Sequence, residues 1–321
     1  MNKKILIVAG DPNSINSEII FKSFKKLKKS EKNKIYVIGN YNLIKKQFKK
    51  LRYKLNLENI KNFSEKFNGS NLKIIDVELN FKNPFKVKKS DASKYVKKSL
   101  NLAHKLAFDK TVSGIINCPI DKKLLSKQNI GVTEYLAAKC NIKNDSEVML
   151  IFNKKLSVTP LTTHINISNV SRKINIKKII NKSKIIDNWF KRKLHKKPKI
   201  GILGLNPHNS ELKNNSEEKK IIIPAILKLK KNGIRAYGPI VSDSIFINDY
   251  KKYDVILGMY HDQVLAPFKA LFKFNAINVT LGLKYLRISP DHGTAIDIIN
   301  KNKASDESLS HCINFLKKYK R

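Results

Sequence analysis

Three of the seven histidines stand directly after apolar, strand-like runs. His164 follows residues 156–163, His208 follows 200–207, and His261 follows 255–260. In α/β proteins the carboxyl ends of parallel strands form the crevice in which ligands bind. Three neutral imidazoles brought to one crevice make a metal site that keeps a coordination position open for substrate. The pattern therefore predicts a metal-assisted enzyme.

The three histidines are far apart in the chain, so the fold and not a short zinc motif would have to assemble the site. Neutral imidazole suits Zn²⁺, Co²⁺, Ni²⁺ or Fe²⁺, and the sequence alone does not choose among them. Any one of these histidines alone would be expected to be a hydrogen-bonded structural residue. Asp262 directly follows His261 and is expected to orient that ligand, to cap a helix, or to do both.

A polar segment near the C-terminus is a second candidate for ligand binding. Asp291 is expected to cap a helix that starts there, and the helix N-terminus would favour an anion such as a phosphate. Gly293 permits close approach of the backbone. His292 is expected to have a supporting role, with a fourth metal ligand or an acid–base group as the alternative.

Basic and amide residues around the last predicted strand form a third candidate. Arg287 can hold a phosphate or carboxylate with two parallel hydrogen bonds, Lys269 can add a point charge, and Asn278 lies between them. In so basic a chain, the alternative for each is a solvated surface position.

Composition limits the class of protein. The chain has 321 residues, 41% of them hydrophobic, and can bury a large core as one α/β unit or two lobes. The net charge of +40 comes from 65 basic and 25 acidic residues. The lysines are spread over nearly every segment, so nucleic acid is not expected to be the partner. Such a charge should steer anionic small molecules towards the protein.

The sequence also predicts a cytoplasmic location. No apolar run reaches the roughly eighteen residues that a membrane span needs, so no membrane partner is expected. The first residues are interpreted as a β-strand and not as a signal peptide. Cys118, Cys140 and Cys312 are few and scattered, which suits a reducing compartment and does not suggest a disulfide framework.

Strands and helices are expected to alternate, which favours a largely parallel sheet with helices on both faces. The predicted strands span 4–8, 34–38, 72–77, 112–117, 148–152, 156–162, 199–205, 254–259 and 276–281. Helices are predicted over 16–27, 90–108, 174–193, 217–231 and 305–319, with Pro224 delaying or kinking the fourth. We expect two lobes, one formed by residues 1–125 and 280–321 and the other by 126–279.

Several common enzyme motifs are absent from the sequence. It has no G-x-G-x-x-G, so a nicotinamide cofactor would not be bound in the usual dinucleotide manner. It also lacks a G-x-x-x-x-G-K-[ST] loop and an H-E-x-x-H motif, which disfavours kinases and zinc proteases.

Six segments, in order along the chain, resemble the 4-hydroxythreonine-4-phosphate dehydrogenase family of pyridoxal phosphate biosynthesis. They begin at Gly10-Asp-Pro and end at Asp291-His-Gly-Thr-Ala295. Between these lie Leu161-Thr-Thr-His164, Gly204-Leu-Asn-Pro-His208, Met259-Tyr-His-Asp-Gln263 and Asn278-Val-Thr-Leu-Gly-Leu283. The resemblance implies a two-lobed α/β/α fold similar to that of the isocitrate and isopropylmalate dehydrogenases.

The resemblance also implies an activity. It is the NAD- or NADP-dependent oxidation of 4-phosphooxy-L-threonine to 2-amino-3-oxo-4-phosphooxybutanoate, which loses CO2 to give 3-amino-2-oxopropyl phosphate. The family forms homodimers whose metal sites draw residues from both subunits. By motif, the metal ligands are His164, His208 and His261, with zinc expected first and magnesium or cobalt as alternatives. The positions that match substrate-binding residues are Thr133, Lys269, Asn278 and Arg287.

The chain departs from the family pattern at a few positions. Val132 stands where the family usually has a substrate-contacting histidine, and valine cannot replace its hydrogen bond. Cys118 stands where glycine or alanine is usual, and the early turn has fewer glycines. The substrate alternatives are therefore threonate or erythronate 4-phosphate, which lack the amino group. A metal-dependent hydrolase that uses the same histidines, with Asp262 or Asp291 as base, is a further alternative.

Overall fold

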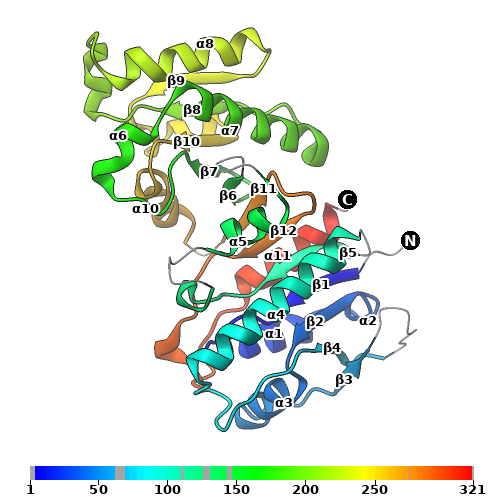
Figure 1. Ribbon diagram of the computed structural model, residues 1–321. Helices are drawn as coiled ribbons and strands as arrows, with labels where there is room; N and C mark the ends of the chain where they lie inside the picture. The colour runs from blue at the N-terminus through cyan, green and yellow to red at the C-terminus, as the bar shows by residue number, and fades with distance from the viewer. Residues whose placement is uncertain are drawn as a thin grey trace. The chain divides into compact units, whose positions relative to one another are not determined.

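The computed structural model describes residues 4–61, 69–109, 112–125, 131–142, 147–273 and 275–319 (Figure 1). The chain divides into two compact units, one formed by Met1–Asn141 with Leu283–Arg321 and the other by Ile142–Gly282. The boundaries expected from the sequence lie near residues 125 and 280, so the first unit extends further along the chain than expected. Each unit contains its own strands and its own covering helices.

The sheet of the first unit has six parallel strands in the order β3-β4-β2-β1-β5-β12. Its strands are β1 (Lys4–Val8), β2 (Ile35–Gly39), β3 (Leu57–Ile60), β4 (Leu72–Asp76), β5 (Val112–Asn117) and β12 (Arg287–Pro290). The central strands are rich in isoleucine and valine, and they are buried along almost their whole length. Such strands are expected where helices cover both faces of a parallel sheet.

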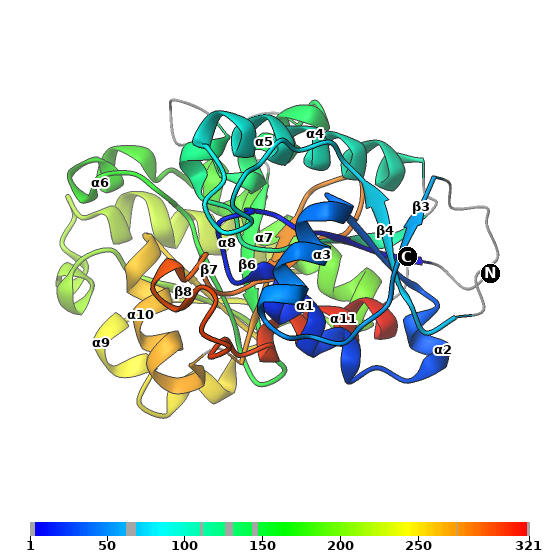
Figure 2. The same cartoon turned by 90° about the horizontal axis from the view of Figure 1, so that it is seen from below.

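Helices cover both faces of this sheet (Figure 2). Helix α4 (Lys89–Phe108) packs on β1, β2 and β5, while α1 (Asn16–Lys25) and α11 (Glu307–Lys318) pack on each other at the opposite face. The other helices of the unit are α2 (Lys29–Lys32), α3 (Tyr41–Lys50), η1 (Lys122–Leu124), α5 (Val132–Lys139) and η7 (Ile296–Ile298).

The sheet of the second unit has the order β11-β6-β7-β10-β8-β9. Its strands are β6 (Val148–Phe152), β7 (Ser157–Pro160), β8 (Ile200–Leu203), β9 (Ala236–Ile240), β10 (Val255–Gly258) and β11 (Ile277–Leu281). The four strands β7, β10, β8 and β9 are parallel, whereas β6 runs antiparallel to both of its neighbours. The prediction of a largely parallel sheet is therefore confirmed, because the strand pairs described above for the two units are parallel except for those of β6.

Helix α7 (Ile176–Trp189) packs against α8 (Ile223–Lys231) and α10 (His261–Phe272) packs against β7 and β10. Pro224 is the second residue of α8, which directly follows a π-helical turn, so the helical segment changes its hydrogen-bonding pattern just before the proline. The shorter elements are η2 (Ile167–Asn169), α6 (Val170–Lys173), η3 (Phe190–Leu194), η4 (Pro207–Leu212), η5 (Glu218–Ile222), α9 (Ser242–Ile245) and η6 (Asp249–Lys252).

Among the described residues, no helix combines the length and the apolar composition that crossing a membrane requires. Cys118, Cys140 and Cys312 are all buried and carry free thiols.

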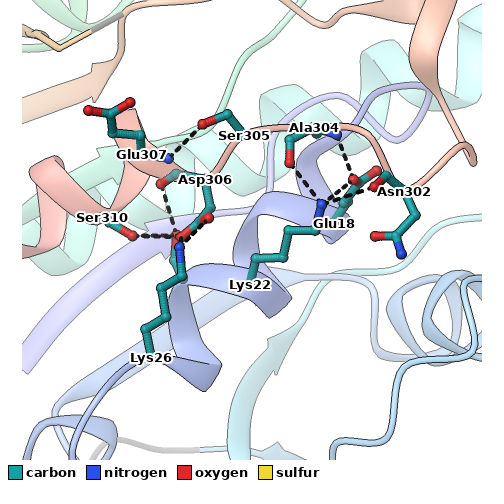
Figure 3. Close-up of polar contacts among 10 residues, drawn as sticks. Glu18, Lys22, Lys26, Asn302, Ala304, Ser305, Asp306, Glu307 and Ser310 are labelled. Carbon is teal, nitrogen blue, oxygen red and sulfur yellow. Dashed lines mark hydrogen bonds and ion pairs between the residues drawn. The ribbon is translucent and has the colours of Figure 1, made fainter.

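A buried carboxylate ties helix α1 to the segment that precedes α11 (Figure 3). Glu18 Oε1 accepts hydrogen bonds from Lys22 Nζ and from the backbone N–H of Ala304, each at 2.7 Å. Lys22 Nζ also donates to the Ala304 carbonyl at 2.8 Å. Because the Glu18 carboxylate and the Lys22 ammonium both hydrogen-bond to Ala304, they hold helix α1 against the segment that leads into α11.

A second carboxylate, Asp306, makes a parallel tie one turn away (Figure 3). Lys26 Nζ lies 2.6 Å and 2.8 Å from its two oxygens, and Ser310 Oγ donates at 2.9 Å. Burial alone would raise the pKa of Asp306, but the hydrogen bonds from Lys26 and Ser310 outweigh it and lower the pKa. The ionised form of Asp306 therefore stabilises the folded state.

We expect Asp306→Asn to lower the free energy of unfolding by about 1 kcal/mol at pH 7, a value kept small because Lys26 is 64% exposed. A lowered pKa in the folded state means that the stabilisation is present above the unfolded-state pKa of about 3.9 and is lost as pH falls through the folded-state value. Urea titrations at several pH values should therefore converge for the variant and the parent as the pH falls through the folded-state pKa of Asp306.

Asp249→Asn is the matched control, because Asp249 and its partner Lys252 are 58% and 68% exposed. It should leave the urea midpoint unchanged. A loss for Asp306→Asn that does not vary with pH would mean that packing, and not charge, accounts for it.

Candidate active site

The three predicted metal ligands follow three adjacent parallel strands of the second unit. Strand β10 pairs with β7 on one side and β8 on the other, with Gly258 opposite Pro160 and Leu257 opposite Ile202. His164, His261 and His208 come a few residues after the ends of β7, β10 and β8, respectively. The expectation that these histidines stand at neighbouring strand ends agrees with this topology.

Hydrogen bonds beyond the ladder hold the segments before His164 and His261 together. The backbone N–H of Leu161 donates to the Gly258 carbonyl at 2.7 Å. The hydroxyl of Thr162 donates to the Met259 carbonyl at 2.7 Å. The rings of His164 and His261 consequently lie with their centres 5.8 Å apart. Since an ion about 2.1 Å from a ring nitrogen lies about 3.2 Å from the ring centre, this separation fits two ligands of one ion.

Asp262 contacts His261 directly. Its Oδ1 lies 2.7 Å from His261 Nδ1, so the carboxylate can fix the tautomer in which the other ring nitrogen, Nε2, carries the lone pair. The alternative of a helix cap is wrong, because the cap position of α10 is Tyr260 and Asp262 lies within the first helical turn.

His208 is oriented differently from the other two histidines. It lies in η4 with a left-handed φ of 48°, its side chain is 75% exposed, and its Nε2 is 3.6 Å from Asp243 Oδ2. The described part of the chain contains no group of three histidine, cysteine, aspartate or glutamate side chains arranged to hold a metal ion. Within one chain, therefore, His164 and His261 lie close together, whereas His208 lies beside Asp243.

Two residues that the sequence analysis missed shape the turn before His208. Glu218 is fully buried and accepts hydrogen bonds from the backbone N–H groups of Leu205 and Asn206, at 2.8 Å and 2.9 Å. Burial raises the pKa of Glu218, but these hydrogen bonds prevail and lower it. Gln263 Nε2 donates to the Gly204 carbonyl at 2.7 Å, which links the ends of β8 and β10. No local pattern reveals either contact, because each joins residues distant in sequence.

Arg287 and Thr133, two predicted substrate-binding residues, contact each other within the first unit. Arg287 NH1 donates to Thr133 Oγ1 at 3.2 Å, and Arg287 Nε donates to Asn117 Oδ1 at 2.6 Å. Arg287 is only 3% exposed, so the alternative of a solvated surface charge is wrong for it. Burial lowers the pKa of its guanidinium to about 10, although the nearby Glu134 opposes the shift. Asn117 is thus a positioning residue that the sequence analysis did not identify.

Lys269 and Asn278 belong to the second unit. Lys269 lies half-buried in the last turn of α10, and Asn278 lies in β11. The side-chain oxygen of Asn278 is buried with no hydrogen-bond partner among the described residues. An unpaired buried acceptor is costly, so this oxygen is suited to a ligand that can donate to it.

The segment around Asp291 and His292 differs from our expectation. No helix begins at Asp291, because the chain stays irregular until η7 starts at Ile296, with a left-handed Ala295 before it. The predicted cap and the predicted anion site at a helix N-terminus are therefore wrong. Asp291 is instead buried, with its backbone N–H donating to Ser308 Oγ at 2.9 Å, and His292 Nδ1 lies 3.0 Å from the Gly293 carbonyl.

A two-unit α/β fold with imidazoles at strand ends and a buried arginine defines the chain as an α/β enzyme. A model of the family described as pyridoxal phosphate biosynthetic protein PdxA matches residues 31–316. The chain belongs to this family, and it is an oxidoreductase. The resemblance recognised in the sequence is thereby confirmed.

Individual relatives agree with this assignment. A 4-hydroxythreonine-4-phosphate dehydrogenase of Sulfurihydrogenibium sp. (strain YO3AOP1) is 38% identical, over 97% of this chain and 96% of that protein. A D-threonate 4-phosphate dehydrogenase of Salmonella typhimurium is 31% identical, over 96% of each chain. The crystal structure of a 4-hydroxythreonine-4-phosphate dehydrogenase from Klebsiella pneumoniae superposes with a TM-score of 0.84 at 28% identity, covering 98% of both chains.

The contact between Arg287 and Asn117 generates a stability prediction. We expect Asn117→Ala to lower the free energy of unfolding by about 2 kcal/mol, because a buried charged donor then loses its acceptor. Urea denaturation followed by circular dichroism measures this change.

Asn101→Ala is the matched control, since Asn101 accepts one hydrogen bond from Tyr135 at an exposed position. It should change the free energy of unfolding by less than about 0.5 kcal/mol. Equal losses in both variants would contradict the role given to Asn117.

Proposed function

We propose that this chain catalyses the NAD- or NADP-dependent oxidation of 4-phosphooxy-L-threonine. The product is 2-amino-3-oxo-4-phosphooxybutanoate, which loses CO2 to give 3-amino-2-oxopropyl phosphate. The main support is the near-full-length similarity to an enzyme named for this reaction, together with the family motifs at the strand ends. The substrate in this proposal is a phosphorylated small molecule, and neither nucleic acid nor a membrane is a partner.

We propose that His164, His208 and His261 hold a divalent cation, with zinc as the first choice. The adjacent rings of His164 and His261 and the carboxylate of Asp262 on His261 support this ligand set. Because His208 faces Asp243 within one chain, the proposal includes a homodimer in which each site draws on both subunits. When bound, such a cation would lower the pKa of the substrate hydroxyl and polarise the ketone that forms.

The chain's own polar residues would bind and orient the two anionic ends of the substrate. Arg287 has a guanidinium already oriented by Asn117 and Thr133, which suits two parallel hydrogen bonds to a phosphate or carboxylate. Lys269 would add a positive charge, and the unpaired oxygen of Asn278 would accept from a substrate donor. Anchoring both ends fixes the carbon that loses hydride and so reduces the entropic part of the barrier.

The activity can be tested by following NADH absorbance. Purified protein with 4-phosphooxy-L-threonine, NAD⁺ and a divalent metal should produce NADH, and removal of the metal by a chelator should abolish the signal. His208→Ala should reduce kcat/KM by at least about 100-fold, since loss of one ligand weakens both metal binding and activation of the hydroxyl.

His195→Ala is the matched control, because His195 is an exposed histidine of the same unit at a helix end. It should retain the parent rate. Undiminished turnover by the metal-free protein would overturn the proposed metal site.

A second candidate substrate is D-threonate 4-phosphate, which has a hydroxyl where 4-phosphooxy-L-threonine has its amino group. Two observations favour considering it, namely the similarity to a D-threonate 4-phosphate dehydrogenase and the presence of Val132. Val132 begins α5 directly before Thr133, so a hydrogen-bonding group is missing beside a proposed substrate contact.

A substrate panel distinguishes the two. We expect kcat/KM to be higher for 4-phosphooxy-L-threonine than for D-threonate or D-erythronate 4-phosphate. Val132→His should lower the KM for the preferred substrate about fivefold, because one added hydrogen bond contributes about 1 kcal/mol. A preference for a hydroxy acid phosphate would replace the proposed substrate while leaving the reaction class intact.

A further inference from the structure

Two adjoining pockets of about 510 and 800 Å³ lie in the first unit, between helix α3 and the connection from β4 to α4. Both are lined by Lys46, Lys82 and Asn83. None of the residues that we predicted for catalysis or substrate binding lines either one. Each of the two volumes lies in the range of pockets that hold small ligands.

The lining is far more basic than the chain as a whole. Six of its residues are lysines and one is an aspartate, whereas the whole chain has 65 basic and 25 acidic residues. The lysines are Lys46, Lys49, Lys50, Lys82, Lys86 and Lys88. Within the described residues none of the six forms an ion pair with a carboxylate. Six clustered cations with a single carboxylate in the lining repel one another, and a bound anion would relieve that repulsion.

Buried amide side chains fix the walls of these pockets. Gln47 Nε2 donates to the carbonyls of Pro12 and Pro84, at 3.0 Å and 2.7 Å. Asn13 and Val87 exchange two hydrogen bonds of 2.9 Å and 2.7 Å. The irregular connection is therefore held at several points, so the lysines extend from a fixed backbone. Ligand binding would therefore cost conformational entropy of the lysine side chains and little of the backbone.

The position within the fold also favours an anion. The connection leaves the carboxyl end of β4, on the side of a parallel sheet where ligands bind. It leads into α4, a helix of 20 residues that has no side-chain cap at Lys88, and Lys88 and Asp91 line the larger pocket. The positive end of the helix dipole therefore adds to the lysine charges.

We propose that these pockets form a binding site for a multiply charged phosphorylated anion, of the pyrophosphate or nucleoside triphosphate class. Lysines supply compact point charges to several phosphate groups without requiring one geometry. Phe81, whose ring lies 5.1 Å from Lys46 Nζ, provides an apolar surface for a base in the larger pocket. The proposal does not depend on the dehydrogenase activity.

The test is equilibrium binding to the full-length protein, measured by titration calorimetry with pyrophosphate, ATP and AMP as probes. We expect saturable binding of pyrophosphate that weakens at least tenfold in the Lys46→Ala/Lys82→Ala double variant. Tighter binding of ATP than of pyrophosphate would identify a nucleotide as the ligand, and equal binding would identify the phosphate groups alone.

Two matched variants distinguish binding in these pockets from a general effect of charge and from binding at the proposed active site. Lys228→Ala/Lys230→Ala removes the same charge from exposed positions of α8 and should change the dissociation constant less than twofold. Lys269→Ala should leave the Lys46-dependent binding event unchanged. If pyrophosphate binding weakened equally in both double variants, the loss would reflect the change in net charge alone, which would contradict the proposal. Loss of binding in Lys269→Ala, or binding of a single-stranded RNA but not of pyrophosphate, would overturn it as well.

Discussion

The in-register parallel pairing of β7, β10 and β8 is the constraint on which the proposed active site depends. Parallel strands that are paired residue by residue end at the same edge of a sheet, so the segments that follow them start close together. Pro160 lies opposite Gly258, and the ladder continues one residue further through Leu161. His164 and His261 need no motif of their own to meet, because the strands bring them together. A slip of one residue in this register would turn alternate side chains to the other face and separate the rings.

Parallel strand pairing also explains how Arg287 of the first unit is accommodated in a buried position. Arg287 is opposite Ile115 in the parallel pair β12 and β5, and Asn117 lies two residues further along β5. Residues two apart in a strand project from the same face, so the amide of Asn117 lies within reach of the guanidinium. Thr133 adds a second acceptor from helix α5. Arg287 can therefore remain charged in a buried position, because fixed dipoles replace part of its lost hydration.

Sequence patterns were sufficient for the elements that form the core. β5 and β6 were predicted with their full bounds. Val148–Phe152 is an apolar run, and Val112–Asn117 is rich in valine and isoleucine although it also contains Ser113 and Asn117. Three strands were missed. β3 is a short edge strand, and β9 contains Gly238 and Pro239, which normally argue against a strand. β12 begins with the charged Arg287, whose burial depends on partners from elsewhere in the chain. The side chains that support the site, such as Glu218 and Asn117, were unpredictable for the same reason.

Strand pairing does not position His208, because this residue lies in an irregular turn after β8. Residues 208–212 have left-handed φ values between 48° and 57°, although none of the five is a glycine. Such a conformation costs roughly 1–2 kcal/mol per residue, so the surrounding structure must compensate for it. Glu218 holds the turn before this segment, and Asn209 Nδ2 donates to the Pro239 carbonyl at 3.1 Å. His164 and His261 are thus positioned by strand pairing, whereas His208 depends on a segment with stored strain. In the proposed metal site, coordination by His208 would therefore be coupled to the conformation of that segment.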